Sequence, residues 1–413
     1  MKICLKKGCH LVEGAKNAAI YDLNNKKIYS INSKSKILLK EVINKDIEKL
    51  NGTQKEYIQE LSKLDLICYD NYVKQENIKI ELPIKLNFAW LELTDRCNLD
   101  CVHCYGEFGH PAVKNASKMK FTDWKKVIDK LSEIKCNAIQ FIGGEPLIYK
   151  DFIKLLEYAY KKNINNITVF TNATLLDEYL VKIFKKYNIN VRVSLYGHNS
   201  ETHEKITGKK GSFEKTKNAL ILLKKYNVNT SIAIVIMKEN ESFLPEIKKY
   251  VKTLGYKFNG YDVIRKNNYK NPNKHQISDY NILKKKYITK PYFFITEKTF
   301  IQNHYYNPCW YGKIAISCDG DILPCVFERD EKIGNIRDSG YNEIERKIKE
   351  YWGITKDSID ICKDCEYRYC CYDCRPLAKG LTGNLNSKYP RCCYNPYTGV
   401  WENIKKCSKE LKN

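Results

Sequence analysis

Residues 87–104 read NFAWLELTDRCNLDCVHC, an apolar, strand-like segment followed at once by three cysteines. Beyond it, strand-like and helix-like segments alternate. The later strand-like segments are NAIQFIG (137–143), NITVFTN (166–172), INVRVSLYG (189–197), TSIAIVIM (230–237) and FNGYDVI (258–264). Repeated βα order predicts an α/β fold with a parallel sheet. Five or six units indicate a barrel or partial barrel, in which chemistry gathers at the carboxyl ends of the strands.

The composition is that of a folded chain without a membrane anchor. The 413 residues are 43% hydrophobic, and the longest apolar run, 232–237, is far shorter than the roughly 20 residues of a membrane span. The N-terminal MKICLKKGCHLVEG lacks the apolar region of a signal peptide. We therefore expect a cytoplasmic protein with no membrane partner.

The net charge of +23 raises the question of a nucleic-acid partner. Only nine of the 71 basic residues are Arg, although Arg is the residue that best reads base edges. The Lys residues are spread along the chain. We therefore expect no nucleic-acid partner, and the charge favours electrostatic steering of an acidic one.

Cysteine is the most informative residue type. The chain has 18, of which 11 lie between Cys309 and Cys407 and none between Cys136 and Cys309. Without a secretion signal, metal or redox sites are favoured over disulfides. Metal ligands also come in local sets at short spacings. The cysteines outside such sets are interpreted as ordinary thiols: Cys4, Cys9, Cys68, Cys136 and Cys407.

Cys97, Cys101 and Cys104 form a CxxxCxxC motif directly after the first strand-like segment. Three thiolates this close can ligate three irons of one cubane cluster and leave the fourth iron open to a substrate or cofactor. Zinc with His103 as a fourth ligand is the alternative. His103 lies between two cysteines on a tight loop, which makes simultaneous ligation awkward.

Polar and glycine residues follow the next strands. Gly143-Gly144-Glu145-Pro146 ends the second strand, where glycine lets the backbone approach a ligand and Glu can accept a hydrogen bond from an amino group. Thr171-Asn172 and Ser194 end the third and fourth; Asn172 and Ser194 also suit a turn residue and a helix cap. Combined with CxxxCxxC one βα unit earlier, this pattern resembles the radical S-adenosylmethionine (SAM) superfamily.

The resemblance implies roles for these residues. Cys97, Cys101 and Cys104 would hold the catalytic [4Fe–4S] cluster, and SAM would chelate its open iron. Its cofactor-binding residues would be His103, which fits the usual aromatic position before the third cysteine, and Gly143, Gly144, Glu145, Pro146, Thr171, Asn172 and Ser194.

The C-terminal cysteines resemble the SPASM extension of radical SAM enzymes, which houses two auxiliary [4Fe–4S] clusters. The resemblance assigns one cluster to Cys309, Cys325 and Cys374, with Cys318 as a possible fourth ligand. It assigns the other to Cys362, Cys365, Cys371 and Cys392. Zinc ribbons are the alternative.

Two neighbouring pairs leave the assignment open. The usual extension has three residues between its last local pair, which fits Cys370 and Cys374 better than Cys371 and Cys374. Cys371 is preferred because it keeps five residues after Cys365. Cys392 and Cys393 pose the same choice, and Cys392 is preferred for its distance from Tyr394-Asn-Pro.

The N-terminal residues predict a small winged-helix-like α+β domain. Apolar segments flank a hairpin turn at Asn24-Asn25, Ser33 is a candidate helix cap, and Thr53-Gln-Lys-Glu56 reads as a capping box. Residues 13–31 resemble the start of radical SAM maturases of ribosomally made peptides, many of which grip a leader peptide on a strand edge. The expected domains are 1–85 for leader recognition, 86–270 for a partial (β/α)6 barrel, 271–308 as connector and 309–413 for SPASM.

The resemblance implies an enzyme with three [4Fe–4S] clusters that uses a 5′-deoxyadenosyl radical to modify a precursor peptide, often by thioether formation. Its expected electron donor is a flavodoxin or ferredoxin. Two alternatives remain. The chain could oxidise a side chain on a protein such as a sulfatase, or it could be a non-catalytic, metal-bound scaffold that binds peptides.

Overall fold

The computed structural model describes residues 2–70, 85–106, 108, 118–265, 274–278, 281, 294–338 and 340–410. The chain forms two compact units. Unit 1 comprises Met1–Pro83, Asp279–Cys309 and Trp352–Asn413, and unit 2 comprises Ile84–Ser278 and Trp310–Tyr351. The N-terminal and C-terminal segments thus belong to the same unit, a grouping that sequence order does not reveal. The domain boundaries expected from the sequence stay a prediction.

Unit 2 is built on an eight-stranded mixed sheet with the strand order β10-β9-β8-β7-β6-β13-β14-β15. Strands β6 to β10 are all parallel, as the βα alternation predicts. The strands are β6 (Phe88–Glu92), β7 (Ala138–Ile142), β8 (Asn166–Thr171), β9 (Asn190–Ser194), β10 (Thr230–Ala233), β13 (Lys313–Ile316), β14 (Asp321–Leu323) and β15 (Gly334–Asn335).

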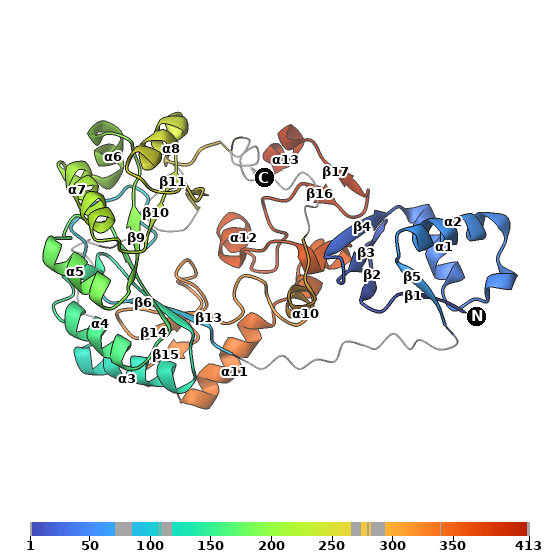
Figure 1. Cartoon of the computed structure of the whole chain (residues 1–413), viewed down its shortest axis with the longest axis horizontal. Coiled ribbons are helices and arrows are strands. Elements are labelled where there is room, and N and C mark those ends of the chain that lie inside the picture. The colour runs from blue at the N-terminus through green and yellow to red at the C-terminus, as the bar shows by residue number, and fades with distance from the viewer. Residues whose placement is uncertain are drawn as a thin grey trace. The chain divides into compact units, whose positions relative to one another are not determined.

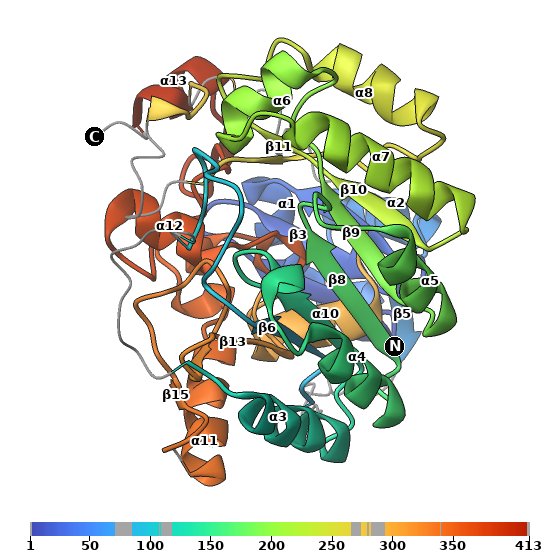
Figure 2. The ribbon, with the colours of Figure 1, turned by 90° about the vertical axis from the view of Figure 1, so that its left-hand side faces the viewer.

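Helices follow the parallel strands and cover the outer face of the sheet (Figures 1 and 2). In α3, the buried residues Trp124, Val127, Ile128 and Leu131 recur at helical spacing and form one apolar stripe. The helices of unit 2 are α3 (Phe121–Glu133), η2 (Pro146–Ile148), α4 (Phe152–Lys161), α5 (Glu178–Lys186), α6 (Ser200–Thr207), α7 (Ser212–Lys225), α8 (Leu244–Thr253) and α11 (Tyr341–Trp352).

The strand expected over 230–237 is interrupted. It divides at Ile234 into β10 and β11 (Val235–Ile236), and β11 pairs in parallel with β12 (Asp262–Val263) in a separate two-stranded sheet. This pair extends the βα order to a sixth strand. The break carries the chain from the main sheet to β12.

The region after residue 309 is more regular than its sequence indicates. Its short segments show no pattern that predicts strands or helices, yet it forms β13, β14, β15 and α11. β13 pairs in parallel with β6, so Ile314 and Ala315 are buried beside the first strand of the sheet. A four-residue strand carries too weak a local pattern to be recognised without its partner.

The N-terminal part of unit 1 has two small sheets and two helices. The antiparallel sheet β2-β3-β4 includes the hairpin predicted at Asn24-Asn25, and β1 pairs with β5. The elements are β1 (Lys2–Leu5), β2 (Cys9–Glu13), β3 (Ala18–Asp22), β4 (Lys27–Ile31), α1 (Ser33–Val42), η1 (Ile47–Lys49), α2 (Gly52–Lys63) and β5 (Ile67–Asp70).

Both helix caps differ from those expected. Asn32 caps α1, and Asn51 forms a capping box with Gln54 at the start of α2, so Ser33 and Thr53 lie inside the helices. The reason is the same at the start of both helices. An Asn carbonyl oxygen one or two residues earlier accepts the free N–H of the first turn, a role for which Asn competes well with Ser and Thr.

The C-terminal part of unit 1 packs against the β2-β3-β4 sheet. Tyr21 of β3 belongs to the same buried aromatic cluster as Phe300, Tyr367, Tyr369 and Tyr394. Figure 1 shows the blue N-terminal strands beside these red segments. The elements are α10 (Glu297–Tyr305), η4 (Lys356–Ser358), η5 (Cys362–Asp364), η6 (Arg368–Cys370), α12 (Arg375–Thr382), β16 (Tyr394–Asn395), β17 (Val400–Trp401) and α13 (Ile404–Glu410).

Much of the connector expected over 271–308 lies outside the described residues. No helix in the described part of the chain is long and apolar enough to cross a membrane.

Candidate active site and cysteine pocket

Unit 2 contains a cavity of about 350 Å³. Its volume is in the usual range for a small-molecule site. Most of the lining comes from the carboxyl ends of β6 to β10 and from the loops that follow them, where a parallel α/β fold places its chemistry. The expected site residues in the lining are Cys97, Cys101, His103, Cys104, Gly143, Gly144, Thr171, Asn172 and Ser194.

The CxxxCxxC loop is held by backbone hydrogen bonds to the end of α6. The Asp100 N–H donates to Thr207 O at 2.9 Å, and the Val102 N–H donates to Ile206 O at 3.0 Å. With the loop fixed, all three thiols line the same cavity. Burial raises the pKa of Cys97 to about 11, so the free thiol stays protonated. Binding a metal would deprotonate it, because the thiolate is the ligand. Three thiols facing one cavity fit the donor set of an iron–sulfur cluster with an open iron.

Gly143 and Gly144 lie against this loop. Gly143 has a φ of 135°, and a Cβ there would lie 2.5 Å from Thr94 O. A Cβ on Gly144 would overlap Arg96 O. The backbones are also joined, because the Gly144 N–H donates to Thr94 O at 2.8 Å and the Glu145 N–H to Arg96 O at 2.9 Å. Both positions therefore need glycine so that the end of β7 can pack against the cysteine loop.

Glu145 turns away from the cavity. Its buried carboxylate accepts hydrogen bonds from the Thr171 hydroxyl at 2.7 Å and from the Asn172 N–H at 2.8 Å, and neither Glu145 nor Pro146 is part of the cavity lining. Burial raises the pKa of Glu145 to about 7. In this arrangement Glu145 fixes the end of β8. Its contact with SAM stays a prediction, as does that of Pro146.

Asn172 connects the end of β8 to the cysteine loop. Its Nδ2 donates to Asn98 Oδ1 at 2.9 Å, and its Oδ1 accepts from the Thr174 N–H at 2.9 Å. His103 is half-buried, and its ring meets the Tyr196 ring edge-on at 4.6 Å between centroids. Burial lowers the pKa of His103 to about 4, so the ring is neutral at physiological pH.

The residue after the third cysteine is held by a buried ion pair. Arg329 Nη1 donates to both oxygens of Glu92 at 2.7 Å, and the Tyr105 hydroxyl donates to Glu92 Oε1 at 3.1 Å. Glu92 is fully buried at the end of β6. Burial and the neighbouring Glu92 raise the pKa of Tyr105 well above its usual value.

Several lining residues were missed from the sequence. Trp90, Gln140, Phe170 and Arg192 lie on β6 to β9, two residues or fewer before the strand ends. The alternation of inward and outward residues along each strand is the signal that indicates them. Phe108, Asp262, Arg265 and Phe327 complete the site from loops and short strands whose placement the sequence does not reveal.

A second set of thiols lines a pocket in unit 1. Four of its members are the cysteines assigned to one auxiliary cluster: Cys362, Cys365, Cys371 and Cys392. Lys356, Arg368 and Lys388 line the same pocket and supply positive charge, which offsets the negative charge of a thiolate-ligated cluster. Burial raises the pKa of Cys371 to about 12 and also raises that of Cys365 and Cys392. The donor set fits a four-thiolate centre.

The thiols surround a space and do not converge on one point. Among the described residues, no three His, Cys, Asp or Glu side chains form a group that could hold a metal ion.

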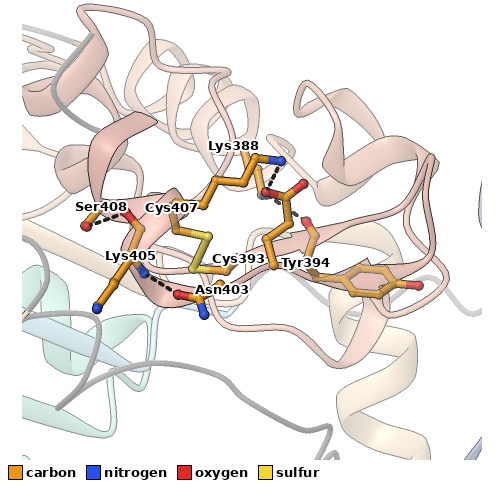
Figure 3. The surroundings of a disulfide bond; sticks show 9 residues. Lys388, Cys393, Tyr394, Asn403, Lys405, Cys407 and Ser408 are labelled. Atoms are coloured by element: carbon orange, nitrogen blue, oxygen red, sulfur yellow. Dashed lines mark hydrogen bonds and ion pairs between the residues drawn. A yellow bond between two sulfur atoms is a disulfide. The ribbon is translucent and has the colours of Figure 1, made fainter.

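The structure places the two competing neighbours outside this pocket. Cys370 accepts a hydrogen bond from the Tyr21 hydroxyl at 3.4 Å and donates to Tyr367 O at 3.1 Å. Cys393 forms a disulfide with Cys407 of α13, as Figure 3 shows. The interpretation of Cys407 as an ordinary thiol is therefore wrong, because α13 folds back over the residue after Cys392.

The cysteines assigned to the other auxiliary cluster are divided between the units. Cys309 and Cys374 belong to unit 1, whereas Cys318 and Cys325 belong to unit 2. Their shared cluster stays a prediction. Cys318 is buried, 3.7 Å from Lys118 Nζ, and burial raises its pKa to about 12.

Two family models match the chain. Residues 91–251 match the radical SAM superfamily, and residues 309–366 match SPASM, an iron–sulfur cluster-binding domain. The first match includes the whole CxxxCxxC loop and the end of β7. The second ends before Cys371, Cys374 and Cys392.

Curated relatives cover most of the chain. The subtilosin biosynthesis protein AlbA of Bacillus subtilis is 29% identical over 75% of this chain and 70% of its own length. The AdoMet-dependent heme synthase of Methanosarcina barkeri is 25% identical over 75% and 96%. The cysteine-type anaerobic sulfatase-maturating enzyme of Clostridium novyi is 28% identical over 68% and 86%.

Solved structures share the fold. Streptococcus suis SuiB bound to its precursor peptide SuiA matches with a TM-score of 0.57 at 16% identity, over 97% of this chain and 99% of SuiB. The enzyme anSMEcpe with bound AdoMet matches with a TM-score of 0.58 at 20% identity, over 78% and 96%. The two family matches and the cysteine-lined cavity lead to one conclusion: the chain has a radical SAM domain over residues 91–251 and a SPASM domain over residues 309–366, and it is a radical SAM enzyme of the SPASM type.

Proposed function

We propose that this enzyme modifies a ribosomally synthesised peptide, by forming a thioether or another side-chain cross-link. One observation carries the choice of substrate. The likeness to SuiB, which was solved with a precursor peptide, extends over 97% of this chain, whereas the likeness to anSMEcpe extends over 78%. AlbA, whose name places it in bacteriocin biosynthesis, supports the same substrate class.

The proposed cofactors are SAM and three [4Fe–4S] clusters. Cys97, Cys101 and Cys104 would hold the catalytic cluster, with SAM against Gly143, Gly144, Asn172 and Ser194. When bound and reduced, this pair supplies the 5′-deoxyadenosyl radical that begins the reaction. The auxiliary clusters would be held by Cys362, Cys365, Cys371 and Cys392, and by Cys309, Cys325 and Cys374 with Cys318.

The chain's own contribution is placement and the exclusion of water. Trp90, Phe170 and Phe327 supply apolar walls to the cavity, so a reactive carbon is shielded from solvent. The Glu92–Arg329 ion pair, through the Tyr105 hydroxyl, and the hydrogen bond from Asn172 to Asn98 hold the cysteine loop from two sides. A rigid loop keeps the reacting groups aligned at no cost during the reaction.

The N-terminal sheet is proposed to bind the leader, as a winged-helix-like recognition domain. β4 pairs only with β3 among the described strands, and an extended peptide can join a sheet at such an edge. Bringing the leader to the enzyme raises the effective concentration of the core peptide. The net charge of +23 suits an acidic leader. We place the reaction in the cytoplasm, with a flavodoxin or ferredoxin as electron donor.

The test is anaerobic. The protein is reconstituted, its iron and sulfide are counted, and 5′-deoxyadenosine is measured after adding dithionite and SAM. We expect about twelve irons per chain. A Cys-bearing precursor peptide encoded beside the gene should then become lighter by two hydrogens per cross-link. A protein that holds zinc and leaves SAM intact would refute the enzyme and revive the scaffold alternative.

Maturation of a sulfatase is the second candidate. The Clostridium novyi relative favours it, at 28% identity over 86% of that protein's length. A synthetic peptide containing a sulfatase active-site cysteine distinguishes the two. Conversion of that cysteine to an aldehyde, with the precursor peptide unchanged, would favour this candidate over the first.

A further inference from the structure

Among the described residues that line the cavity of unit 2, one basic side chain has no carboxylate partner. Three of its lining residues carry a full charge: Arg192, Asp262 and Arg265. Arg265 Nη2 and Asp262 Oδ2 form an ion pair at 2.8 Å, and the Arg265 guanidinium also lies 4.0 Å from the centre of the Phe327 ring. These two charges offset one another. Within the described part of the chain, Arg192 has no ion pair.

Arg192 is positioned by the alternation of β9. Val191 and Val193 are buried on the outer side of the strand, whereas Arg192 and Ser194 line the cavity. Arg192 is exposed and lies opposite Phe170 in the register of β8 and β9. Its guanidinium carbon is 5.3 Å from the centre of the Phe170 ring.

The Phe170 ring holds the guanidinium without using its hydrogen bonds. A cation–π contact uses none of the guanidinium N–H donors, so they stay available to a ligand. Those donors match the two oxygens of a carboxylate, a pair that forms two parallel hydrogen bonds. Gln140, on β7, is another polar side chain in the lining of the cavity.

The position of Arg192 along β9 separates it from the residues expected to bind the cofactor. Thr171, Asn172 and Ser194 lie at the strand ends. Arg192 precedes Ser194 by two residues, which places it about 7 Å from Ser194 along the strand. Its neighbour across the strand pair is the uncharged Phe170, and Trp90 and Gln140 are further uncharged residues of the same lining.

We propose that Arg192 is the carboxylate-binding residue of the cavity. This inference rests on the proposed function and deepens it. The carboxylate belongs either to the substrate peptide, as an Asp or Glu side chain or a C-terminus near the reacting residue, or to SAM itself. The chemistry of recognition is the same for both sources, and the experiment separates them.

The test is chemical labelling of the reconstituted enzyme under anaerobic conditions. Phenylglyoxal modifies accessible arginines, and mass spectrometry gives the labelling rate of each one. The probes are SAM alone and two amidated, N-acetylated peptide libraries of the form X3-Glu-X3 and X3-Gln-X3. At ten times the dissociation constant, a ligand that covers Arg192 should slow its labelling about tenfold.

Arg346 is the matched control. It lies on α11, is mostly exposed, and pairs with Glu350 outside the cavity. Protection of Arg192 by the Glu library and not by the Gln library supports a peptide carboxylate. Protection by SAM supports the cofactor carboxylate. If neither changes the labelling of Arg192 relative to Arg346, the proposal is overturned.

Variants give a second readout. Arg192→Gln should weaken binding of the protecting ligand about tenfold or more, since a hydrogen bond to a charged group is lost, and Arg192→Lys should weaken it less. Equal binding by both variants and the parent would count against the proposal. Neither measurement needs turnover. If the parent enzyme fails to cleave SAM, the proposed function fails, but the Glu-library measurement still decides the role of Arg192.

Discussion

His203 illustrates how burial sets the protonation of a single side chain. It lies on α6 with about 1% of its surface exposed, and its Nδ1 accepts a hydrogen bond from the Tyr196 N–H at 3.2 Å. Burial lowers its pKa to about 4. In the unfolded chain its pKa returns to about 6.5. The neutral ring therefore contributes stability that is complete above pH about 6.5 and is lost as the pH falls towards 4.

We expect unfolding to become easier by about 2 kcal/mol between pH 8 and pH 5 from this residue alone. The measurement is the free energy of unfolding at both pH values for the parent and for His203→Asn. The variant should lose less stability across this range. His304→Gln, at an exposed position of α10, is the control. Equal slopes for the parent and His203→Asn would contradict the assignment.

The close packing at Gly144 allows a prediction about stability and SAM binding. A methyl group there would overlap Arg96 O, so Gly144→Ala should push the cysteine loop away from β7. We expect a loss of about 2 kcal/mol in stability, the usual cost of overpacking, and SAM binding weaker by about tenfold. Equilibrium dialysis with SAM measures the second effect. Gly52→Ala is the control, because a Cβ at that helix start would meet nothing within 4 Å. SAM binding equal to the parent's would show that the close approach is not needed.

The residues of the site divide by the kind of signal they carry. Cys97, Cys101 and Cys104 could be predicted because their spacing has few other uses in chemistry. Cys371 and Cys392 could only be preferred over Cys370 and Cys393 as ligands. Two adjacent cysteines have almost the same sequence spacing, and only the structure shows which of them lines the pocket. Arg192 could not be singled out from the sequence. Its proposed role in binding a carboxylate depends on the absence of a nearby carboxylate among the described residues, which only the structure shows.

At the scale of elements, the turn between β2 and β3 is joined to the loop that carries the pocket cysteines. The Ala15 N–H donates to Asp364 O at 2.7 Å, and Arg368 Nη1 donates to Glu13 O at 2.7 Å. A Cβ on Gly14 would overlap Glu366 Oε2 and lie 2.8 Å from Glu366 N. The turn thus supports residues 364–368 from one side.

Gly14→Ala should therefore disturb the four-cysteine pocket from a distance. We expect a loss of about four irons per chain after reconstitution, one cluster's worth, with the catalytic cluster retained. Iron and sulfide analysis with electron paramagnetic resonance checks this. Gly340→Ala in unit 2, where a Cβ meets nothing within 4 Å, is the control. Full iron content in Gly14→Ala would show that the turn does not support the pocket.

The elements themselves were predictable where their signal is local. The alternation of strands and helices in 86–265 gave β6 to β10 and their helices, because each helix has an apolar stripe of its own. β13 could not be predicted, because its four residues have no distinctive local pattern and are recognised as a strand only by their pairing with β6. The end of β10 at Ile234 could not be predicted, because the sequence stays apolar through Met237.

At the scale of the whole molecule, unit 1 depends on both ends of the chain. Tyr21 and Val12 pack with Tyr367, Tyr369 and Tyr394, so the outer face of the N-terminal sheet is covered by C-terminal residues. The other face of the sheet has its own core with α1 and α2, which includes Ile20, Leu39 and Ile58. The sheet should thus remain folded but exposed when the C-terminal segment is absent.

A chain that ends at Tyr351 tests this. We expect stronger binding of the dye ANS and faster hydrogen exchange in β2 to β4, because an apolar face is uncovered. Exchange in β6 to β10 should change little. A chain that ends at Glu402 and lacks only α13 is the control. If the shorter chain bound no additional dye, the aromatic cluster would not be what covers the sheet.

This shared cluster also has a consequence for how the protein is made. Tyr21 bonds to Glu366, 345 residues later in the sequence. At the pace of a ribosome, the N-terminal sheet waits about half a minute for the residues that cover it. The cysteines of the pocket, Cys362 to Cys392, lie in the same late part of the sequence. The four-thiol pocket can therefore bind iron only after Cys392 has left the ribosome, whereas the CxxxCxxC loop is available much earlier in synthesis.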